Sequence, residues 1–388
     1  MHTHHITLPP GARILIVKLA SLGDLLLSTP ALRALRETYP DARIDLLVTP
    51  ESAHLLKGWD VLDHIIVLDK YLFDYPHQML IHPVRLLHLS LFWNTLRDGR
   101  YDAVLLFHHL TLPFGRLKHQ VLMRATGAKW RVGLDNGHGW FLNVRVHDGG
   151  FGAMHEAEYN MALARAVGAQ VRDKHLFLPL SQQDREQARQ LIYGDAAAPA
   201  DIQRPVIAMH PGSGGYSTAR RWAPERFAKL ADTLFHDVGG QLLLVGGPEE
   251  VELHQQVIRI MEDMTVRSLA GKASIHVTGA VFELVDLFIG NDAGPMHLAA
   301  AVGTPVVAIF GLSNYKAWGP YTGDDPAQRV EVAHLDLPCM PCFYHGHQLG
   351  TPEGCATRDC LAMLGVDPVA VAARKLLREY KRQGTALH

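Results

Sequence analysis

The sequence lacks several features that would place the protein in common classes. None of its apolar runs is long enough to span a bilayer, and residues 1–10 are polar and His-rich, without the apolar core of a signal peptide. The turn after the first expected strand is not Gly-x-Gly-x-x-Gly, and no P-loop pattern occurs, so nicotinamide and ATPase functions lose their usual support. We therefore expect a cytoplasmic protein outside those classes.

Charge is also scarce and nearly balanced. Charged residues make up 20% of the chain, and the formal net charge is −2, so no global field attracts nucleic acid. Hydrophobic residues make up 48% of the 388 residues, enough for two or three domains with sizeable cores. We expect a globular protein with no nucleic-acid partner, in which any cationic binding surface is local.

The chain does contain a regular alternation of strand-like and helix-like segments. Continuous apolar runs are typical of buried parallel strands, and runs with helical spacing lie between them. The pattern predicts an α/β fold of two doubly wound, Rossmann-like domains that face a cleft. The expected strands are 13–18, 43–48, 64–68, 101–107, 206–209, 241–245, 284–289 and 306–310, and the expected helices are 25–38, 78–96, 224–236, 249–262 and 368–381.

An Ala/Pro/Asp-rich stretch at residues 195–205 separates the two halves. Because ligands of doubly wound sheets bind outside the carboxyl ends of the strands, the residues that follow each strand are the functional candidates. The expected organisation is an N-terminal domain (1–180), a linker region (181–204), a C-terminal domain (205–365) and a C-terminal helix (366–388).

Residues 290–297 (GNDAGPMH) follow one such strand and begin a helix of small residues. Gly294 can take backbone angles that other residues avoid, and Pro295 suits the first helical position. The unpaired N–H groups of that first turn attract anions, so a phosphate-bearing ligand flanked by Asp292 and His297 is expected. The alternative is an ordinary turn in which His297 is a hydrogen-bonded core residue.

The first strand ends in residues 18–24 (KLASLGD), where Asp24 begins the following helix. One role for Asp24 is to cap that helix. The other is to project into the cleft as a general base. The position alone leaves both roles open.

The first strand of the second half ends in residues 209–215 (MHPGSGG), followed by Arg220 and Arg221. A Gly/Ser loop offers N–H groups and hydroxyls to phosphate, and adjacent arginines can neutralise a diphosphate. The alternative is a flexible loop with solvated arginines. After the next strand, Glu249 is placed either to accept hydrogen bonds from a ribose or to cap a helix.

Taken together, these motifs resemble the bacterial heptosyltransferases of glycosyltransferase family 9. Residues 18–24 with 30–32 (PAL) are similar to the N-terminal motif of that family, residues 210–213 with 220–227 (RRWAPERF) to its donor loop, and residues 291–300 to its nucleotide-sugar motif. Each piece alone is weak, but their order and spacing agree from about residue 13 to 311. The resemblance implies the GT-B architecture and an inverting, metal-independent transfer of heptose from ADP-heptose to the lipopolysaccharide core.

The resemblance also implies residue roles. Asp24 matches the catalytic base, and Arg220 matches a donor-phosphate position usually held by Lys, which keeps the charge but changes the geometry. The helix after Gly294 would help Arg220 to stabilise the leaving diphosphate. The residues implied in donor binding are Ser213, Gly214, Glu249, Asp292, Ala293, Gly294 and His297.

Three other functions stay open. The same scaffold could use a different nucleotide sugar or acceptor, act as a nucleotide-sugar epimerase, or bind a nucleotide sugar without catalysis. The Asp24 and Arg220 combination favours chemistry over binding alone.

All four cysteines fall within 22 residues: Cys339, Cys342, Cys355 and Cys360. The first pair has the spacing of a metal knuckle, and four thiolates complete a tetrahedral structural site for zinc or iron. Because four protein ligands leave no open position, such a metal would not be catalytic. Reduced thiols or labile disulfides are the alternatives.

A local basic stretch in the first half comprises Arg116, Lys118, Arg124, Lys129 and Arg131. It is either a solvated face or a contact for acidic groups of the acceptor, for which Arg116, Lys118 and Arg124 are the candidates. Aromatic residues nearby are expected in the core or at the inner face of the inner membrane, with the core favoured for the last two: Tyr71, Phe73, Tyr75, Phe92 and Trp93.

Overall fold

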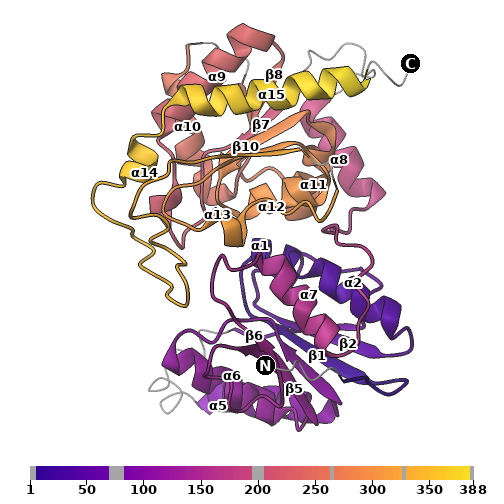
Figure 1. The fold of residues 1–388 in the computed structure, drawn as a ribbon. Coiled ribbons are helices and arrows are strands. Elements are labelled where there is room, and N and C mark those ends of the chain that lie inside the picture. The colour runs from indigo at the N-terminus through magenta and orange to yellow at the C-terminus, as the bar shows by residue number, and fades with distance from the viewer. Residues whose placement is uncertain (1–5, 70–82, 195–204, 263–265, 326–328, 385–388) are drawn as a thin grey trace. The chain divides into compact units, whose positions relative to one another are not determined.

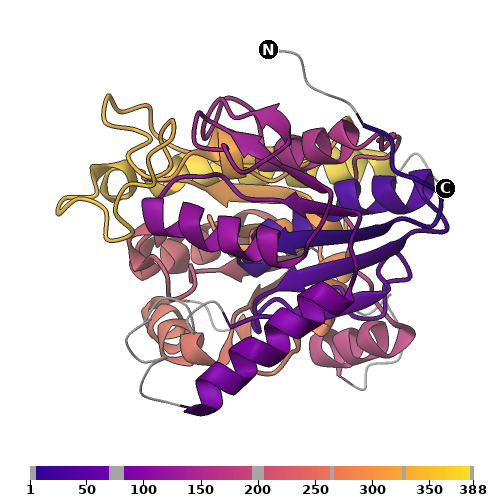
Figure 2. The ribbon, with the colours of Figure 1, turned by 90° about the horizontal axis from the view of Figure 1, so that it is seen from below.

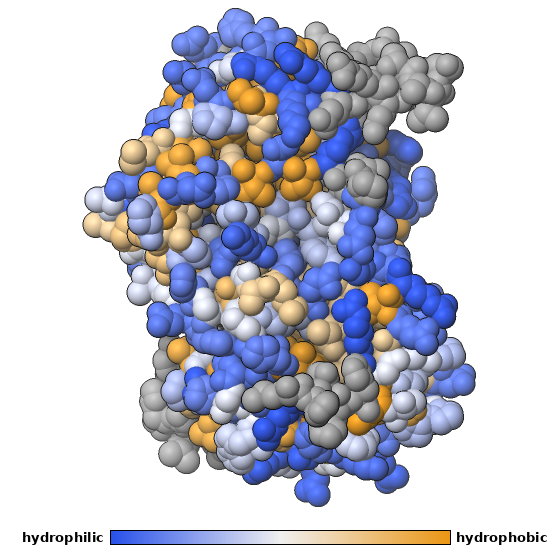
Figure 3. Space-filling view, in the orientation of Figure 1, coloured by the Kyte–Doolittle hydropathy of each residue, from blue (hydrophilic) through white to orange (hydrophobic). Residues whose placement is uncertain are grey.

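The computed structural model describes residues 6–69, 83–194, 205–262, 266–325 and 329–384. The chain divides into two compact units, unit 1 (Met1–Lys174) and unit 2 (His175–His388), and each contains a parallel six-stranded sheet with helices on both faces (Figure 1). The predicted α/β class with two doubly wound domains is confirmed. The face of the molecule drawn in Figure 3 is largely hydrophilic, with hydrophobic side chains in patches.

In unit 1 the strand order is β3-β2-β1-β4-β5-β6. Strand β1 lies between β2 and β4 and is almost entirely buried, as its Ile-Leu-Ile-Val run predicts. Helices α2 and α7 pack together, while α5 and α6 lie on the other face, the one seen in front in Figure 2. The strands are β1 (Arg13–Lys18), β2 (Arg43–Val48), β3 (His64–Val67), β4 (Ala103–Leu106), β5 (Trp130–Asp135) and β6 (Val144–His147); the helices are α1 (Leu22–Leu26), α2 (Thr29–Thr38), α5 (Pro83–Asp98), α6 (Pro113–Ala125) and α7 (Glu156–Ala166).

In unit 2 the order is β12-β11-β10-β7-β8-β9. Helix α15 packs against β10, β11 and β12 beside α9, and α12 packs against β10 and β11 beside α11. The strands are β7 (Val206–His210), β8 (Gln241–Leu244), β9 (Val266–Ser268), β10 (Leu287–Asn291), β11 (Val306–Ile309) and β12 (Val330–Ala333); the helices are α8 (Gln182–Tyr193), α9 (Pro224–Val238), α10 (Val251–Ile260), α11 (Ile275–Leu284), α12 (Gly294–Ala301), α13 (Tyr315–Trp318), α14 (Asp359–Ala362) and α15 (Val366–Gly384), with 3₁₀ turns η2 (Thr218–Arg220) and η3 (Pro248–Glu250).

The helix predicted over 25–38 is two helices, α1 and α2. Between them the Ser28 hydroxyl donates to the Leu25 carbonyl at 2.6 Å and the Thr29 hydroxyl to the Leu26 carbonyl at 2.7 Å. Pro30 follows and has no N–H for a continuous helical ladder. The interruption follows from this proline and from side chains that bond back to the preceding turn.

The division between the units falls at residue 174, whereas the sequence placed the end of the first domain at 180. Residues 182–193 of the expected linker form helix α8, which packs on α11 within unit 2. Residues 195–204, which make up most of the Ala/Pro/Asp-rich stretch, lie outside the described residues. The expected C-terminal helix begins at Val366 as α15.

None of the helices in the described parts of the chain combines the length and the apolar character needed to cross a membrane.

Candidate functional site

The donor loop and the nucleotide-sugar motif emerge side by side in unit 2. Strands β7 and β10 are parallel neighbours, with His210 paired to Gly290. The loop after His210 and the turn after Asn291 therefore leave the same edge of the sheet, where ligands of doubly wound folds bind. The fold thus brings together two motifs that are about 80 residues apart in the sequence.

Asn291 is the residue that joins these two segments. Its amide nitrogen donates to the carbonyl oxygens of Pro211 at 2.8 Å and Gly212 at 3.0 Å, and its amide oxygen accepts the Trp222 N–H at 3.0 Å. The side chain is fully buried, so all three bonds are made away from competing water. Asn291 fixes the start and the end of the donor loop but was given no role from the sequence.

Arg220 lies over this loop. Its guanidinium donates to Asp292 Oδ2 at 3.2 Å and to the Ser213 carbonyl at 3.3 Å. The same carboxylate oxygen accepts the Ser313 hydroxyl at 2.6 Å. Three expected site residues are therefore in contact, and Ser313, which the sequence analysis did not single out, completes the group.

Arg221 binds the loop as well. Its Nε donates to Ser213 Oγ at 3.2 Å, and that hydroxyl donates to the Ser217 carbonyl at 2.8 Å. Gly214 has a φ of +67°, a left-handed conformation that favours glycine. The Ser213 hydroxyl is thus engaged within the loop, and two cationic groups border the loop backbone.

The turn into α12 differs in detail from the expectation. Gly294 begins the helix and has no positive φ, and Pro295 is its second residue rather than its first. Ala293 precedes the helix with extended backbone, and His297 is buried on the first turns. The glycine therefore does not supply a left-handed turn here.

Two adjacent glutamates, Glu249 and Glu250, follow β8 and lie in different environments. Glu249, the expected ribose contact, is exposed. Glu250 is buried, and its Oε2 lies 3.0 Å from His210 Nε2 and accepts the Gly247 N–H at 3.2 Å. Although burial alone would raise the pKa of Glu250, the hydrogen bond and charge of His210 bring it below its usual value.

The contact between Glu250 and the donor loop is close. A Cβ added at Gly212 would lie 1.6 Å from Glu250 Oε1, so a larger residue there would require this carboxylate to move. Glu250 therefore packs directly against the donor loop. The sequence offered two adjacent glutamates, and nothing in the pattern separated the exposed one from the buried one.

Asp24 lies in unit 1, in the first turn of α1. Its Oδ2 accepts the Ser21 hydroxyl at 2.6 Å and the Ser21 N–H at 3.2 Å. Both bonds stabilise the charged carboxylate, and neither uses Oδ1. The capping interaction weighed from the sequence is present, and it leaves one oxygen for a further partner. Whether Asp24 acts with Arg220, which belongs to unit 2, stays a prediction.

The expected acceptor-binding cations all lie on helix α6. Arg116 donates to the Leu110 carbonyl at 3.0 Å and the Thr111 carbonyl at 2.6 Å, and so orders the segment before the helix. Lys118 and Arg124 lie over aromatic rings.

The aromatic residues expected in the core or at the membrane have mixed outcomes. Phe92 packs against the core, and Trp93 is exposed, contrary to expectation. Tyr71, Phe73 and Tyr75 lie outside the described residues.

Unit 1 also holds a buried charged group that the sequence analysis missed. The two ring nitrogens of His109, which follows β4, each lie 2.9 Å from a carboxylate, Nδ1 from Asp148 and Nε2 from Glu156. Burial alone would lower the pKa of His109, but the Glu156 charge and the hydrogen bonds raise it to about 9. An imidazolium therefore joins the ends of β4 and β6 to the start of α7.

The four cysteines are unpaired, and Cys339, Cys342 and Cys355 are exposed. The pKa of Cys342 is raised, first by burial and then by the neighbouring thiols of Cys355 and Cys339, and Cys355 Sγ accepts the Arg358 N–H at 3.3 Å. Yet no group of three or more possible ligands in the described residues is placed to hold a metal ion. As they are arranged, the thiols do not form the expected tetrahedral site.

The fold and the strand-end site define a two-domain α/β protein of the GT-B type. The family description "Glycosyltransferase family 9 (heptosyltransferase)" matches residues 90–351, and the chain belongs to this family. It is a glycosyltransferase. Lipopolysaccharide heptosyltransferase 3 of Escherichia coli K12 is 28% identical over 77% of this chain and 83% of its own.

Solved structures agree in fold. A family 9 glycosyltransferase from Veillonella parvula superposes with a TM-score of 0.71 at 24% identity, covering 95% of this chain and 98% of its own. The E. coli heptosyltransferase WaaC, solved with ADP, gives 0.63 at 20% identity over 95% and 99%. The iron-containing glycosyltransferase TibC of E. coli gives 0.56 at 15% identity over 96% and 78%.

Proposed function

We propose that the protein transfers heptose from ADP-heptose to a lipopolysaccharide core acceptor, with inversion and without a catalytic metal. The observation that carries the proposal is the cationic loop of unit 2, where Arg220 and Arg221 border the Ser213–Gly214 backbone. Support for the donor comes from WaaC, solved with ADP and with ADP-2-deoxy-2-fluoro heptose. Support for the acceptor comes from the name of the E. coli relative.

In the proposed reaction Asp24 takes the proton of the acceptor hydroxyl. The hydroxyl oxygen then attacks the anomeric carbon, and the bond to the diphosphate breaks on the opposite face. Arg220 and the loop N–H groups stabilise the charge that develops on the departing ADP. Asp292 holds Arg220 in place, while His297, the α12 turn and Glu249 contribute to donor binding.

On the acceptor side, Arg116, Lys118 and Arg124 are the proposed contacts for acidic groups. The enzyme would work at the inner face of the inner membrane, where a lipid-anchored acceptor is presented. No nucleic acid takes part.

The arginine pair allows a direct test of donor binding. Arg220→Ala should weaken ADP binding by about 1.5–3 kcal/mol, because a charge-assisted hydrogen bond to phosphate is lost. Arg221→Ala, the matched control, should cost less, because Arg220 contacts Asp292 of the nucleotide-sugar motif, whereas Arg221 is held within the loop by Ser213 Oγ and the Gly214 carbonyl. Titration calorimetry with ADP measures both, and the reverse ranking would assign the phosphate contact to Arg221.

A panel of nucleotide sugars tests the reaction itself. ADP-heptose should bind and transfer to a core oligosaccharide, with release of ADP. Preferred binding and transfer from another nucleotide sugar would show that the donor is not ADP-heptose. Conversion of the donor without an acceptor would indicate an epimerase, and binding without any turnover would indicate a binding protein.

A structural metal ion stays a prediction from the cysteine spacing, and TibC shows that a protein of this fold can contain iron. Purified protein should hold about one zinc or iron per chain, and chelation should lower the melting temperature because binding orders the loop. Elemental analysis together with thiol titration checks this. Four reactive thiols in the native, metal-free protein would refute it.

A further inference from the structure

A group of large apolar side chains is exposed on and beside helix α6. Their exposed fractions run from 43% to 63%, which is costly for side chains that normally drive burial. We call this group the α6 surface; it comprises Leu112, Phe114, Leu117, Val121 and Trp140.

The helical geometry places these residues on one stripe. Phe114, Leu117 and Val121 have the spacing i, i+3, i+7, so they share an arc of about 60°. Lys118 and Arg124 project just to either side of that arc. An apolar stripe bordered by long cationic side chains is the arrangement of helices that lie in a membrane interface.

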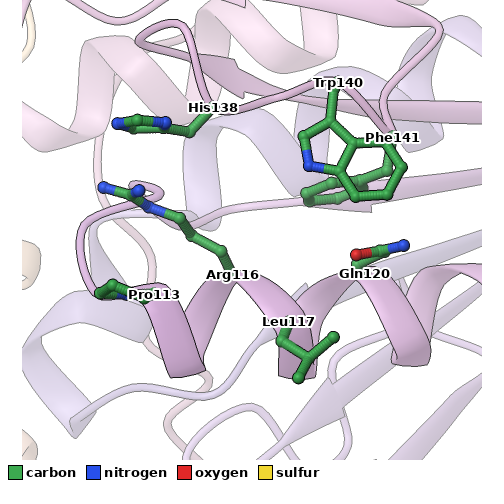
Figure 4. Close-up of a pocket in the computed structure, with 7 residues that line it drawn as sticks. All are labelled: Pro113, Arg116, Leu117, Gln120, His138, Trp140 and Phe141. Carbon is green, nitrogen blue, oxygen red and sulfur yellow. The ribbon is translucent and has the colours of Figure 1, made fainter.

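The cations are held against the apolar residues. Lys118 Nζ lies 5.8 Å from the Phe114 ring centroid, and the Arg124 guanidinium lies 5.2 Å from that of Trp140. Beside Trp140 is an open pocket of about 230 Å³; Figure 4 shows Arg116 and His138 at one end and Trp140 at the other. Apolar and cationic groups are thus presented together.

The local charge has a single sign. Residues 103–134 contain no Asp or Glu but five Lys or Arg residues, although the whole chain has a net charge of −2. Such a segment is complementary to an anionic surface. A soluble glycan would use the cations but has no use for the apolar stripe, whereas a bilayer uses both.

We infer that the α6 surface docks on an anionic lipid bilayer. Phe114, Leu117 and Trp140 enter the boundary between headgroups and acyl chains, and Lys118 and Arg124 meet headgroup phosphates. The inference rests on the proposed function for its purpose, which is to bring the enzyme to a lipid-anchored acceptor. It refines the proposed acceptor contacts by assigning these cations to the membrane around the acceptor.

Vesicle co-sedimentation of the full-length protein tests the inference without the reaction. The protein should sediment with phosphatidylglycerol/phosphatidylcholine vesicles and at least about tenfold less with phosphatidylcholine alone. The variant L117Q/W140Q should lose at least about tenfold of the anionic-vesicle binding. The control M363Q/V371Q removes two apolar side chains of similar exposure in unit 2 (65% and 60%) and should bind as wild type.

ADP affinity, measured on the same three proteins, separates this idea from the proposed function. ADP affinity should be unchanged in L117Q/W140Q. If the wild-type protein binds vesicles but transfers no heptose, the proposed reaction is wrong and the docking surface stands. Equal vesicle binding by both variants would overturn the docking surface. So would light scattering that shows a dimer dissociated by L117Q/W140Q, or displacement from vesicles by a lipid-free core oligosaccharide.

Discussion

Replacing Asp24 by Asn should reduce transfer by roughly a hundredfold or more while ADP affinity stays near that of wild type. The amide cannot take the proton of the acceptor hydroxyl, and loss of a general base has an effect of this size. The substitution keeps the shape of the side chain, and its amide oxygen can still accept the Ser21 hydroxyl. Single-turnover transfer with saturating ADP-heptose measures the chemical step.

The control for this experiment is Asp41→Asn, which removes an exposed carboxylate of the same unit. It should leave turnover unchanged. If Asp24→Asn also had near-normal turnover, Asp24 would be a helix cap only. If ADP affinity fell together with turnover, Asp24 would act on the donor instead of the acceptor.

The fold was largely predictable because its central strands are continuously apolar. Strands β1 and β2 have the bounds expected from the sequence. The expected set omitted β5, β6, β9 and β12. In β5 and β6, the apolar pattern is interrupted by Arg131, Asp135, Arg145 and His147. Strand β6 is the edge of the sheet, and β5 is paired with both β4 and β6, so tertiary pairing outweighs the local pattern.

The candidate donor site was predictable as segments but not as contacts. Each motif follows a strand, so chain order placed Arg220 and Asp292 at one sheet edge. The bond from Ser313 to Asp292 and the bonds from Asn291 to the loop carbonyls needed the folded geometry, because Ser313 is 21 residues from Asp292 and the loop carbonyls are about 80 residues from Asn291. The residues next to a position in the sequence do not indicate contacts with residues this far along the chain.

His109 illustrates the same limit in unit 1. It follows an expected strand, which is the position where functional side chains gather, but its carboxylate partners lie 39 and 47 residues further along. Only the fold shows that it is buried and paired, and that pairing has a consequence for stability.

The His109 cluster should make unit 1 less stable as pH rises from 6.5 to 9. The pKa of His109 is raised from 6.5 in the unfolded chain to about 9 in the fold. A raised pKa stabilises the fold fully below pH 6.5, and this contribution is lost as pH rises through 9. The difference corresponds to about 3 kcal/mol, one of the larger effects expected from a single side chain.

His109→Gln should remove this pH dependence and lower stability at pH 6.5 by about 3–5 kcal/mol, because Asp148 and Glu156 keep buried charges without the imidazolium. Hydrogen exchange of peptides from β4 and α7, corrected for intrinsic rates, reports unit 1 alone. His138→Gln, an exposed histidine of the same unit, is the control. His119 and His254, whose pKa is lowered to about 4 by burial, stay neutral across this window. A wild-type decline that persists in His109→Gln would assign the pH dependence to another group.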